Sequence, residues 1–146
     1  MQAEVVTIGT ELLLGQIIDT NAAYISQQLA AVGVNVFYRT NVGDNEERAA
    51  SVLRQALERA DIIITTGGLG PTVDDITRSA VARATDRPLK LNEHLLTLIE
   101  TMFTRWGRAM SESNRRQAEV PDPCIPFENP VGTAPGFIVE QNGHVM

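Results

Sequence analysis

Residues 61–66 (DIIITT) form a short apolar run that is followed directly by a turn rich in glycine, GGLG, at residues 67–70. Three consecutive isoleucines in so short a run are typical of a strand covered on both faces, as strands are in a parallel sheet. Residues 3–8 and 34–40 have the same character, and each run precedes a segment with helical periodicity. This alternation predicts an α/β domain with a mostly parallel sheet and helices on both faces.

The segments between these strands carry signals for the starts and ends of helices. Asn21 is expected to cap a helix that ends at Gly33, and Asp44 with Glu47 matches the D-x-x-E pattern that begins a second helix. A third helix is predicted over residues 72–84, within and after the glycine turn. Because each helix follows a strand, the carboxyl ends of the strands should meet at one edge of the sheet, where ligands bind in folds of this class.

The second half of the chain predicts one long helix and a hairpin. Residues 92–106 place apolar side chains at three- and four-residue spacing, and Trp106 at the end of this stripe is expected to pack in or beside the core. Five prolines between residues 121 and 135 exclude a long helix there. Asn142 and Gly143 lie between two apolar segments and predict an antiparallel hairpin at the end of the chain.

The composition limits the class of partner. The chain has 146 residues, which suits one domain, and a net charge of −6 without any Lys/Arg-rich run. Nucleic acid and anionic membranes are therefore not expected as main partners, although Arg115 and Arg116 form one local basic pair. The single cysteine, Cys124, and two isolated histidines offer no metal-ligand spacing. Nothing resembles a signal peptide or the roughly 20 apolar residues of a membrane span, so a cytoplasmic location is expected.

The glycine turn is the strongest candidate for a ligand site. Three glycines in TTGGLGPT (residues 65–72) let the backbone approach a ligand, and the start of the next helix adds a positive dipole end. The turn contains no lysine and is not a P-loop, so a bound phosphate needs another cation. Asp74 and Asp75 can supply one by holding Mg²⁺. The alternative is structural, since Thr72-x-x-Asp75 is also a capping pattern.

Two other segments bring polar groups to predicted turns. Thr10 and Glu11 follow the first strand, within GTELLLGQIIDTN (residues 9–21). NPVGTAPG (residues 129–136) is a rigid loop whose Thr133 and backbone amides can bind a second anionic group. Both segments also have an ordinary structural explanation, as a strand-to-helix connection with caps and as a turn.

Taken together, these segments resemble a known family. TTGGLGPTVDDIT (residues 65–77) is similar to the GG-x-G-x-x-x-x-D-x-T signature of molybdopterin-binding domains of the MoaB/MogA type. GTELLLGQIIDTN, VGDN, NRRQA and NPVGTAPG, in this order, resemble the branch formed by the N-terminal domain of the competence/damage-inducible protein CinA. The resemblance covers nearly the whole chain. It implies one three-layer α/β domain over residues 1–146 that continues beyond the last residue.

The resemblance implies an activity and a set of partners. CinA-type domains are associated with Mg²⁺-dependent hydrolysis of ADP-ribose to AMP and ribose 5-phosphate, whereas the wider family binds molybdopterin. The expected function is therefore hydrolysis of the pyrophosphate bond of ADP-ribose or a related nucleotide. The alternative is a non-catalytic module that binds molybdopterin or a nucleotide. The NMN amidohydrolase activity of many CinA proteins belongs to a separate C-terminal domain and is not expected of these residues. Family relatives form dimers or trimers, so a homo-oligomer is expected.

The resemblance also transfers to individual residues. The expected catalytic residues are Asp75, which occupies the position of the signature acid, Asp44 and Glu11. The expected Mg²⁺ ligands are Asp75, Asp44 and Asp74. The amides of residues 67–72 are expected to hold the phosphates. The expected ligand-binding residues are Thr10, Asp19, Asn21, Gly67, Gly68, Gly70, Thr72, Thr77, Asn129, Gly132, Thr133 and Gly136.

Overall fold

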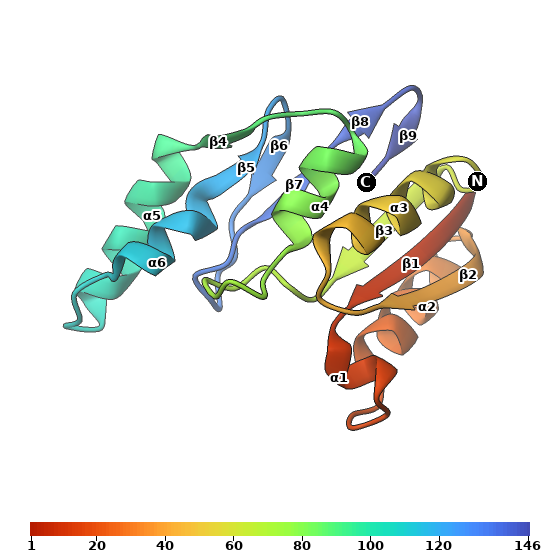
Figure 1. Ribbon diagram of the computed structural model, residues 1–146, viewed down its shortest axis with the longest axis horizontal. Helices are drawn as coiled ribbons and strands as arrows, with labels where there is room; N and C mark the ends of the chain where they lie inside the picture. Colours follow the sequence, from red (N-terminus) through yellow and green to blue (C-terminus); the bar gives the residue numbers. More distant parts are fainter.

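The computed structural model describes residues 1–146, and at its centre lies a 5-stranded sheet with the strand order β2-β1-β3-β9-β8 (Figure 1). The long strands that run parallel are β1 (Gln2–Ile8), β2 (Asn35–Val42) and β3 (Ile62–Thr66). The short strand β9 (His144–Val145) pairs parallel with β3, and β8 (Glu140–Gln141) pairs antiparallel with β9. The expected mostly parallel sheet with an antiparallel C-terminal hairpin is confirmed.

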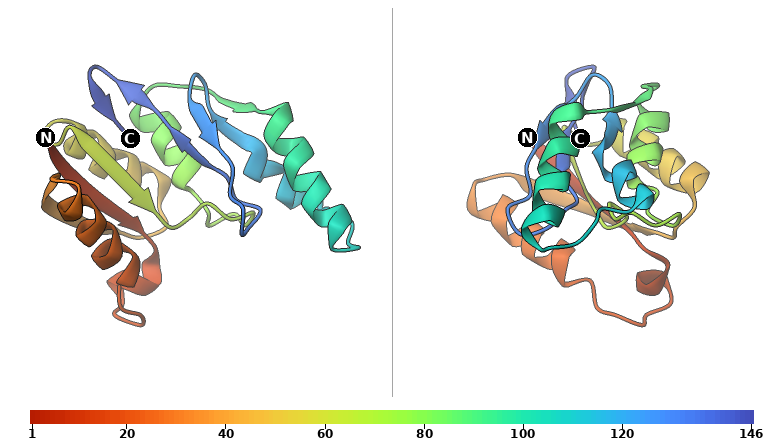
Figure 2. Two further views of the ribbon diagram at one scale, coloured as in Figure 1. Left: turned by 180° about the vertical axis from the view of Figure 1, so that it is seen from behind. Right: turned by 90° about the vertical axis from the view of Figure 1, so that its left-hand side faces the viewer.

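Helices cover both faces of this sheet, because successive side chains of a strand point to opposite faces. The helices are α3 (Glu46–Leu57) and α4 (Thr77–Ala84) on one face and α2 (Thr20–Ala31) on the other. The view from behind in Figure 2 places α2 in front of the strands. Val6 and Ile8 of β1 belong to the core under α3 and α4. Thr7, between them, donates a hydrogen bond to Asp19 at the start of α2. A short helix, α1 (Thr10–Leu13), follows β1.

A second, smaller unit is formed by the residues between α4 and β8. Its elements are β4 (Leu89–Leu91), α5 (Glu93–Arg105), α6 (Glu112–Arg115), the 3-10 helix η1 (Arg116–Ala118), β5 (Glu119–Pro121), β6 (Ile125–Phe127) and β7 (Gly136–Ile138). β4 pairs antiparallel with β5, and β6 pairs antiparallel with β7. Its core consists of Leu95, Leu96, Ile99, Ala118 and Val120. Figures 1 and 2 show α5 at the opposite end of the molecule from β2.

Two helix caps differ from the expectation. α2 is capped by Asp19 and not by Asn21, and α3 is capped by Asn45 and not by Asp44. In both cases the capping side chain accepts the backbone N–H of the residue three positions further along. Asp44 does not cap α3, and its Oδ2 accepts the N–H of Thr10 instead.

The helix after the glycine turn begins at Thr77 and not at residue 72. The pattern Thr72-x-x-Asp75 forms an isolated turn, in which the Asp75 carboxylate accepts both the N–H and the hydroxyl of Thr72. The capping pattern is thus present, but it closes a loop rather than a helix. The residue before α4, Ile76, has no side-chain capping bond.

The expectation for Trp106 is also wrong, because this residue is 53% exposed. It follows the last turn of α5, where its ring packs edge-on against Phe103 at a centroid distance of 5.5 Å. The hairpin prediction is confirmed, since Asn142 (φ 51°) and Gly143 (φ 87°) form the turn between β8 and β9. None of the helices has the length and apolar character that a membrane span requires.

Candidate functional site

The candidate site is built around the connection from β3 to α4, here named the glycine loop (residues 67–72). Gly67 has φ 95° and Gly68 has φ 59°, both in the left-handed region that favours glycine. A Cβ atom at Gly67 would collide with the carbonyl oxygen of Ile8 in β1. A Cβ atom at Gly68 would lie 2.6 Å from the hydroxyl oxygen of Thr77. Glycine is therefore required at both positions by conformation and by space.

Thr77 and Arg78, at the start of α4, hold the carbonyl groups of the glycine loop so that these groups point toward α4. The bonds are Thr77 Oγ1 to Gly67 O at 2.6 Å, Thr77 N–H to Gly68 O at 3.1 Å, Arg78 Nη1 to Leu69 O at 2.5 Å and Arg78 Nη2 to Gly70 O at 2.7 Å. The peptide bonds here are trans, so the N–H that follows each carbonyl points the opposite way. The N–H groups of Gly68 and Leu69 therefore point away from α4. Neither of them makes a hydrogen bond within the protein.

Arg78 has no counterpart among the expected site residues. It is only 6% exposed, and its guanidinium lies behind the glycine loop, bonded to two of the loop carbonyls. Burial lowers the pKa of Arg78, although the nearby Asp75 carboxylate opposes this effect. Since an arginine keeps its proton in proteins, a positive charge is held beneath the loop. The signal in the sequence is that Arg78 is the first cation after the three glycines.

Asp75 closes the glycine loop from its other end. Its Oδ2 accepts the N–H of Thr72 at 2.8 Å and the hydroxyl of Thr72 at 2.6 Å. Burial raises the pKa of Asp75, but the bonds from Thr72 and the amide of Gly70 act against it. Together with the charge of Arg78, they hold the pKa of this carboxyl below its ordinary value. Asp74, in contrast, is exposed to solvent.

Asp44 and Thr10 link the carboxyl ends of the other two long strands. The Asp44 carboxylate accepts the N–H of Thr10 at 3.0 Å, and the N–H of Asp44 donates to Thr10 Oγ1 at 3.1 Å. A backbone bond from Gly9 N–H to Val42 O, 2.9 Å long, supports the same junction. Glu11 is exposed, and its carboxylate lies beside Gly9. The structure thus brings two of the predicted segments together at the edge where β1 and β2 end.

Asp19 and Asn21 lie at the start of α2, where Asp19 has a structural task. One oxygen of Asp19 accepts the N–H of Ala22 at 2.9 Å, and the other accepts the hydroxyl of Thr7 at 2.7 Å. The second oxygen also lies 3.9 Å from the guanidinium of Arg39. Both carboxylate oxygens of Asp19 therefore make contacts within the protein. Asn21 is exposed, so its amide is open to solvent.

The second predicted ligand loop, which precedes β7, is shaped by its own side chains. The amide of Asn129 donates to one backbone carbonyl and accepts one backbone N–H within the loop, both at 3.0 Å. A Cβ atom at Gly136 would overlap the ring of Phe127, which packs over this glycine. Asn129 and Gly136 thus shape the loop, and Asn129, Gly132 and Thr133 line a cavity between the loop and α5.

The sheet topology places this loop toward the same edge as the glycine loop. Val145 of β9 pairs with Ile62, the first residue of β3, so the hairpin turn lies at the amino ends of the parallel strands. β8 runs antiparallel to β9, and β7 leads directly into β8. The start of β7 and the loop before it therefore lie toward the carboxyl ends.

The structure does not gather the predicted metal ligands into one cluster. No three His, Cys, Asp or Glu side chains lie close enough together to hold a metal ion. Asp44 is bonded to Thr10, Asp75 is bonded to Thr72, and Asp74 faces solvent. The carboxylates at this edge therefore do not form a preformed site of three protein ligands.

Comparisons with known proteins identify the family of the chain. A family model described as a probable molybdopterin binding domain matches residues 4–146. Putative competence-damage inducible proteins of Acetivibrio thermocellus and Halothermothrix orenii are 50% and 47% identical over 146 residues. The match covers 100% of this chain but 35% of each relative, so the chain spans about a third of the length of these curated relatives.

Solved structures show the same relationship. The protein CinA of Thermoplasma acidophilum is 36% identical and has a TM-score of 0.91, covering 99% of this chain and 84% of that chain. A molybdopterin biosynthesis protein of Mycobacterium abscessus is 17% identical, with a TM-score of 0.63 over 99% of this chain and 77% of that chain, and shares the fold. The chain therefore belongs to the family of probable molybdopterin-binding domains, and within it to the branch of the CinA proteins.

Proposed function

We propose that this chain binds a pterin or nucleotide that carries phosphate, with the phosphate at the glycine loop. The observation that carries the proposal is the direction of the Gly68 and Leu69 N–H groups, which point away from α4 and have no partner in the protein. Successive amides that point to one side of a turn form a concavity suited to anions. The guanidinium of Arg78 adds a positive charge behind these amides.

Mg²⁺ fits this site only as an ion that arrives together with the phosphate. No three-ligand cluster is present, but Mg²⁺ is commonly held by one or two carboxylates, with water and phosphate oxygens as the other ligands. Asp75 and the exposed Asp74 are the residues that would hold it at the glycine loop. When bound, Mg²⁺ supplies neutralisation of the charge on the phosphate oxygens.

The test is a binding measurement with inorganic pyrophosphate, AMP and ADP-ribose. We expect the unaltered protein to bind them, and Gly68→Ala to lose most of this binding because a Cβ at residue 68 displaces Thr77 and turns the amides. Gly33→Ala is the matched control, since Gly33 also has a positive φ (79°) but lies in open space. Unchanged binding by Gly68→Ala, or absence of binding by the unaltered protein, would refute the proposal.

A second candidate function is hydrolysis of the pyrophosphate bond of ADP-ribose. The observation that favours it is the set of carboxylates at this edge, Asp44, Asp75 and Glu11, because phosphate binding alone gains nothing from acidic neighbours. In this reaction the oxygen of a water molecule forms a bond to one phosphorus while the bridging P–O bond breaks. The products are AMP and ribose 5-phosphate, and Glu11 is the candidate to take the proton of the water.

Hydrolysis is tested by incubating the protein with ADP-ribose with and without Mg²⁺. We expect AMP to form only with Mg²⁺, and Asp75→Asn to reduce turnover at least about 100-fold. Asp86→Asn removes the same charge at an exposed residue with positive φ, which asparagine tolerates, and should retain full activity. Binding of the three ligands without any AMP formation would exclude hydrolysis and leave the binding function intact.

A further inference from the structure

One face of the molecule carries almost no charge, although the chain as a whole is acidic. Charged residues make up 21% of the sequence, yet Asp19 is the only one between residues 12 and 32. This stretch consists of the end of α1, the loop that follows it, α2 and Val32. The side chain of Asp19 is only 11% exposed, and its oxygens make contacts within the protein. We name the surface of residues 12–32 the uncharged face.

The loop between α1 and α2 exposes a group of aliphatic side chains on this face. Each of these side chains is more than half exposed, and they are Leu13, Leu14, Ile17 and Ile18. Figure 1 shows the loop extending away from the sheet, below α1. Single exposed apolar residues are common on soluble proteins, whereas a contiguous group of them marks an interaction site.

The exposed side of α2 continues the uncharged face. Its outward stripe is formed by Tyr24, Gln27, Gln28 and Ala31, which follow one another at three- and four-residue spacing and are all exposed. α2 contains no charged residue among its 12 residues, whereas α3, of the same length, contains four. A surface helix normally presents charged residues to solvent. The lack of charge and the exposed tyrosine of α2 are instead typical of the centre of a protein interface.

The charge of the chain limits what can cover the uncharged face. A partner with charged groups at the contact would lose their hydration without gaining an opposite charge, so the partner surface must also be uncharged. The chain has a net charge of −6, and two copies therefore repel each other wherever their charged surfaces meet. At the uncharged face two copies approach with the least repulsion. The length of this face, roughly 20 residues, is comparable to the ~20–30 residues a side of a stable interface.

We propose that the uncharged face binds the same face of a second copy of this chain, across a two-fold axis. In a contact of this kind both copies use one self-complementary surface. The aliphatic loop and the outward stripe of α2 become buried, and the charged faces stay in solvent. A homo-oligomer is expected from the resemblance to the CinA proteins, and the proposal assigns a surface to it. This surface adjoins the candidate site, because a Cβ atom at Gly43, next to Asp44, would lie 3.2 Å from Leu13.

Sedimentation equilibrium of the unaltered chain over a range of concentrations tests the dimer. We expect twice the chain mass of 15.9 kDa at high concentration and the mass of one chain on dilution. Salt at about 1 M should preserve or strengthen the dimer, because it screens the repulsion between the two acidic chains and no ion pair holds them together. A single-chain mass at every concentration up to about 1 mM, or dissociation by salt, would overturn the inference.

A matched pair of variants tests whether this face forms the dimer. Ile18 is 86% exposed in the uncharged face, and Val131 is 92% exposed in the loop before β7, so glutamate at either position leaves the buried core unchanged. Ile18→Glu should weaken dimerisation at least about 100-fold, because it places an unpaired charge in the contact. Val131→Glu adds the same charge elsewhere and should dimerise as the unaltered chain does. Equal dimerisation by the two variants would show that the dimer uses another surface.

Tyr24→Arg is an independent variant on α2 that changes the charge in the opposite sense. It makes the chain less acidic, so it would strengthen any association that is limited only by charge repulsion. We expect it to weaken the dimer at least about tenfold instead, because the arginine is unpaired in the contact. Tighter or unchanged dimerisation of Tyr24→Arg would contradict the proposal. Circular dichroism spectra that match the unaltered chain establish that the three variants are folded.

Discussion

The Asp75 carboxylate stabilises the glycine loop only while it is charged, which makes the loop sensitive to acid. The pKa of Asp75 in the folded protein lies below its ordinary value, so its contribution to stability is present above the pKa of an unfolded aspartate. It is lost as the pH falls through the folded-state pKa. We expect the difference in the free energy of unfolding between the unaltered protein and Asp75→Asn to be largest near neutral pH and to vanish in acid. Urea unfolding at a series of pH values measures this difference.

The buried Glu4 also has a lowered pKa in the folded protein, so it contributes to the pH dependence of stability in the unaltered protein and in Asp75→Asn alike. Burial raises the pKa of Glu4, but bonds from Arg59 and Thr40 outweigh it. Acid therefore destabilises both variant and unaltered protein through Glu4, and only the difference between them reports on Asp75. A difference that does not change with pH would show that the Asp75 charge contributes nothing to the loop.

Single residues differ in how far the sequence reveals their roles. The sequence indicates the turn at Gly67 and Gly68, because the positive φ and the limited space at these positions leave few other residue types possible. Arg78 was not predicted, since an arginine on a helix is usually solvated and its burial arises only when the loop folds back over it. The sequence does not reveal the burial of Glu4 for a related reason. It lies in an apolar strand pattern and is 0% exposed, and its partner Arg59 is distant in the sequence.

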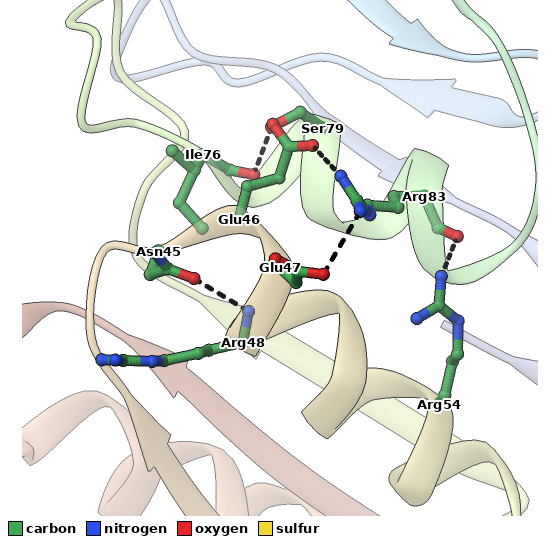
Figure 3. A network of polar contacts seen from close by, with 8 residues as sticks. All are labelled: Asn45, Glu46, Glu47, Arg48, Arg54, Ile76, Ser79 and Arg83. Atoms are coloured by element: carbon green, nitrogen blue, oxygen red, sulfur yellow. Dashed lines mark hydrogen bonds and ion pairs between the residues drawn. The ribbon is translucent and has the colours of Figure 1, made fainter.

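At the scale of elements, α3 and α4 pack through small apolar residues and are joined at the surface by ion pairs. Ala49, Ala50, Leu53, Ala80 and Val81 are fully buried in the core. Figure 3 shows the surface contacts, in which Arg83 of α4 lies 3.5 Å from Glu46 and 3.6 Å from Glu47. Arg54 also donates to the Arg83 carbonyl at 2.9 Å. Since all these charged side chains are partly exposed, packing rather than charge should hold the helices together.

The stability of the α3–α4 pair should therefore depend more on its buried side chains than on its ion pairs. Leu53→Ala should lower the free energy of unfolding by about 2–5 kcal/mol, because a large buried side chain is removed and a cavity remains. Arg83→Ala should lower it by about 0–1 kcal/mol, as is usual for exposed ion pairs. Chemical denaturation of both variants measures the two values. A larger effect for Arg83→Ala than for Leu53→Ala would show that the ion pairs dominate.

The sequence predicts these elements better than their ends. The apolar runs and stripes located the long parallel strands β1, β2 and β3 and the helices α2, α3 and α5, because periodicity reflects the side that is buried, whereas the short elements α1, α6 and β4 to β7 were not predicted. The caps at Asp19 and Asn45 were missed by one or two residues, since neighbouring Asp and Asn residues are equally good caps. Asn45 caps α3, while Asp44 makes a tertiary hydrogen bond with the N–H of Thr10. Such a bond joins residues 34 positions apart and has no local signal.

At the scale of the whole molecule, two hydrophobic cores meet through very few side chains. Phe137 and Cys124 are partly buried, and both pack against the core of the sheet and against the core under α5. The glycine loop belongs to the first unit, and the cavity between α5 and the loop before β7 belongs to the second. The relative position of these two features therefore depends on how firmly the two units are joined, and Phe137 is the larger of the two shared side chains.

The single tryptophan makes this junction measurable. Trp106 lies at the end of α5 and reports on the second unit, whereas circular dichroism reports on all helices and strands. In the unaltered protein we expect the two signals to lose their native values over the same range of urea, because the cores are packed together.

Phe137→Ala should lower the free energy of unfolding by about 3 kcal/mol and move the Trp106 transition to lower urea than the circular dichroism transition. Phe37→Ala removes an exposed ring of β2 and should change neither signal by more than about 0.5 kcal/mol. If the two transitions of Phe137→Ala still coincide, Phe137 does not couple the units, and the packing of α4 against β5 is the contact that joins them.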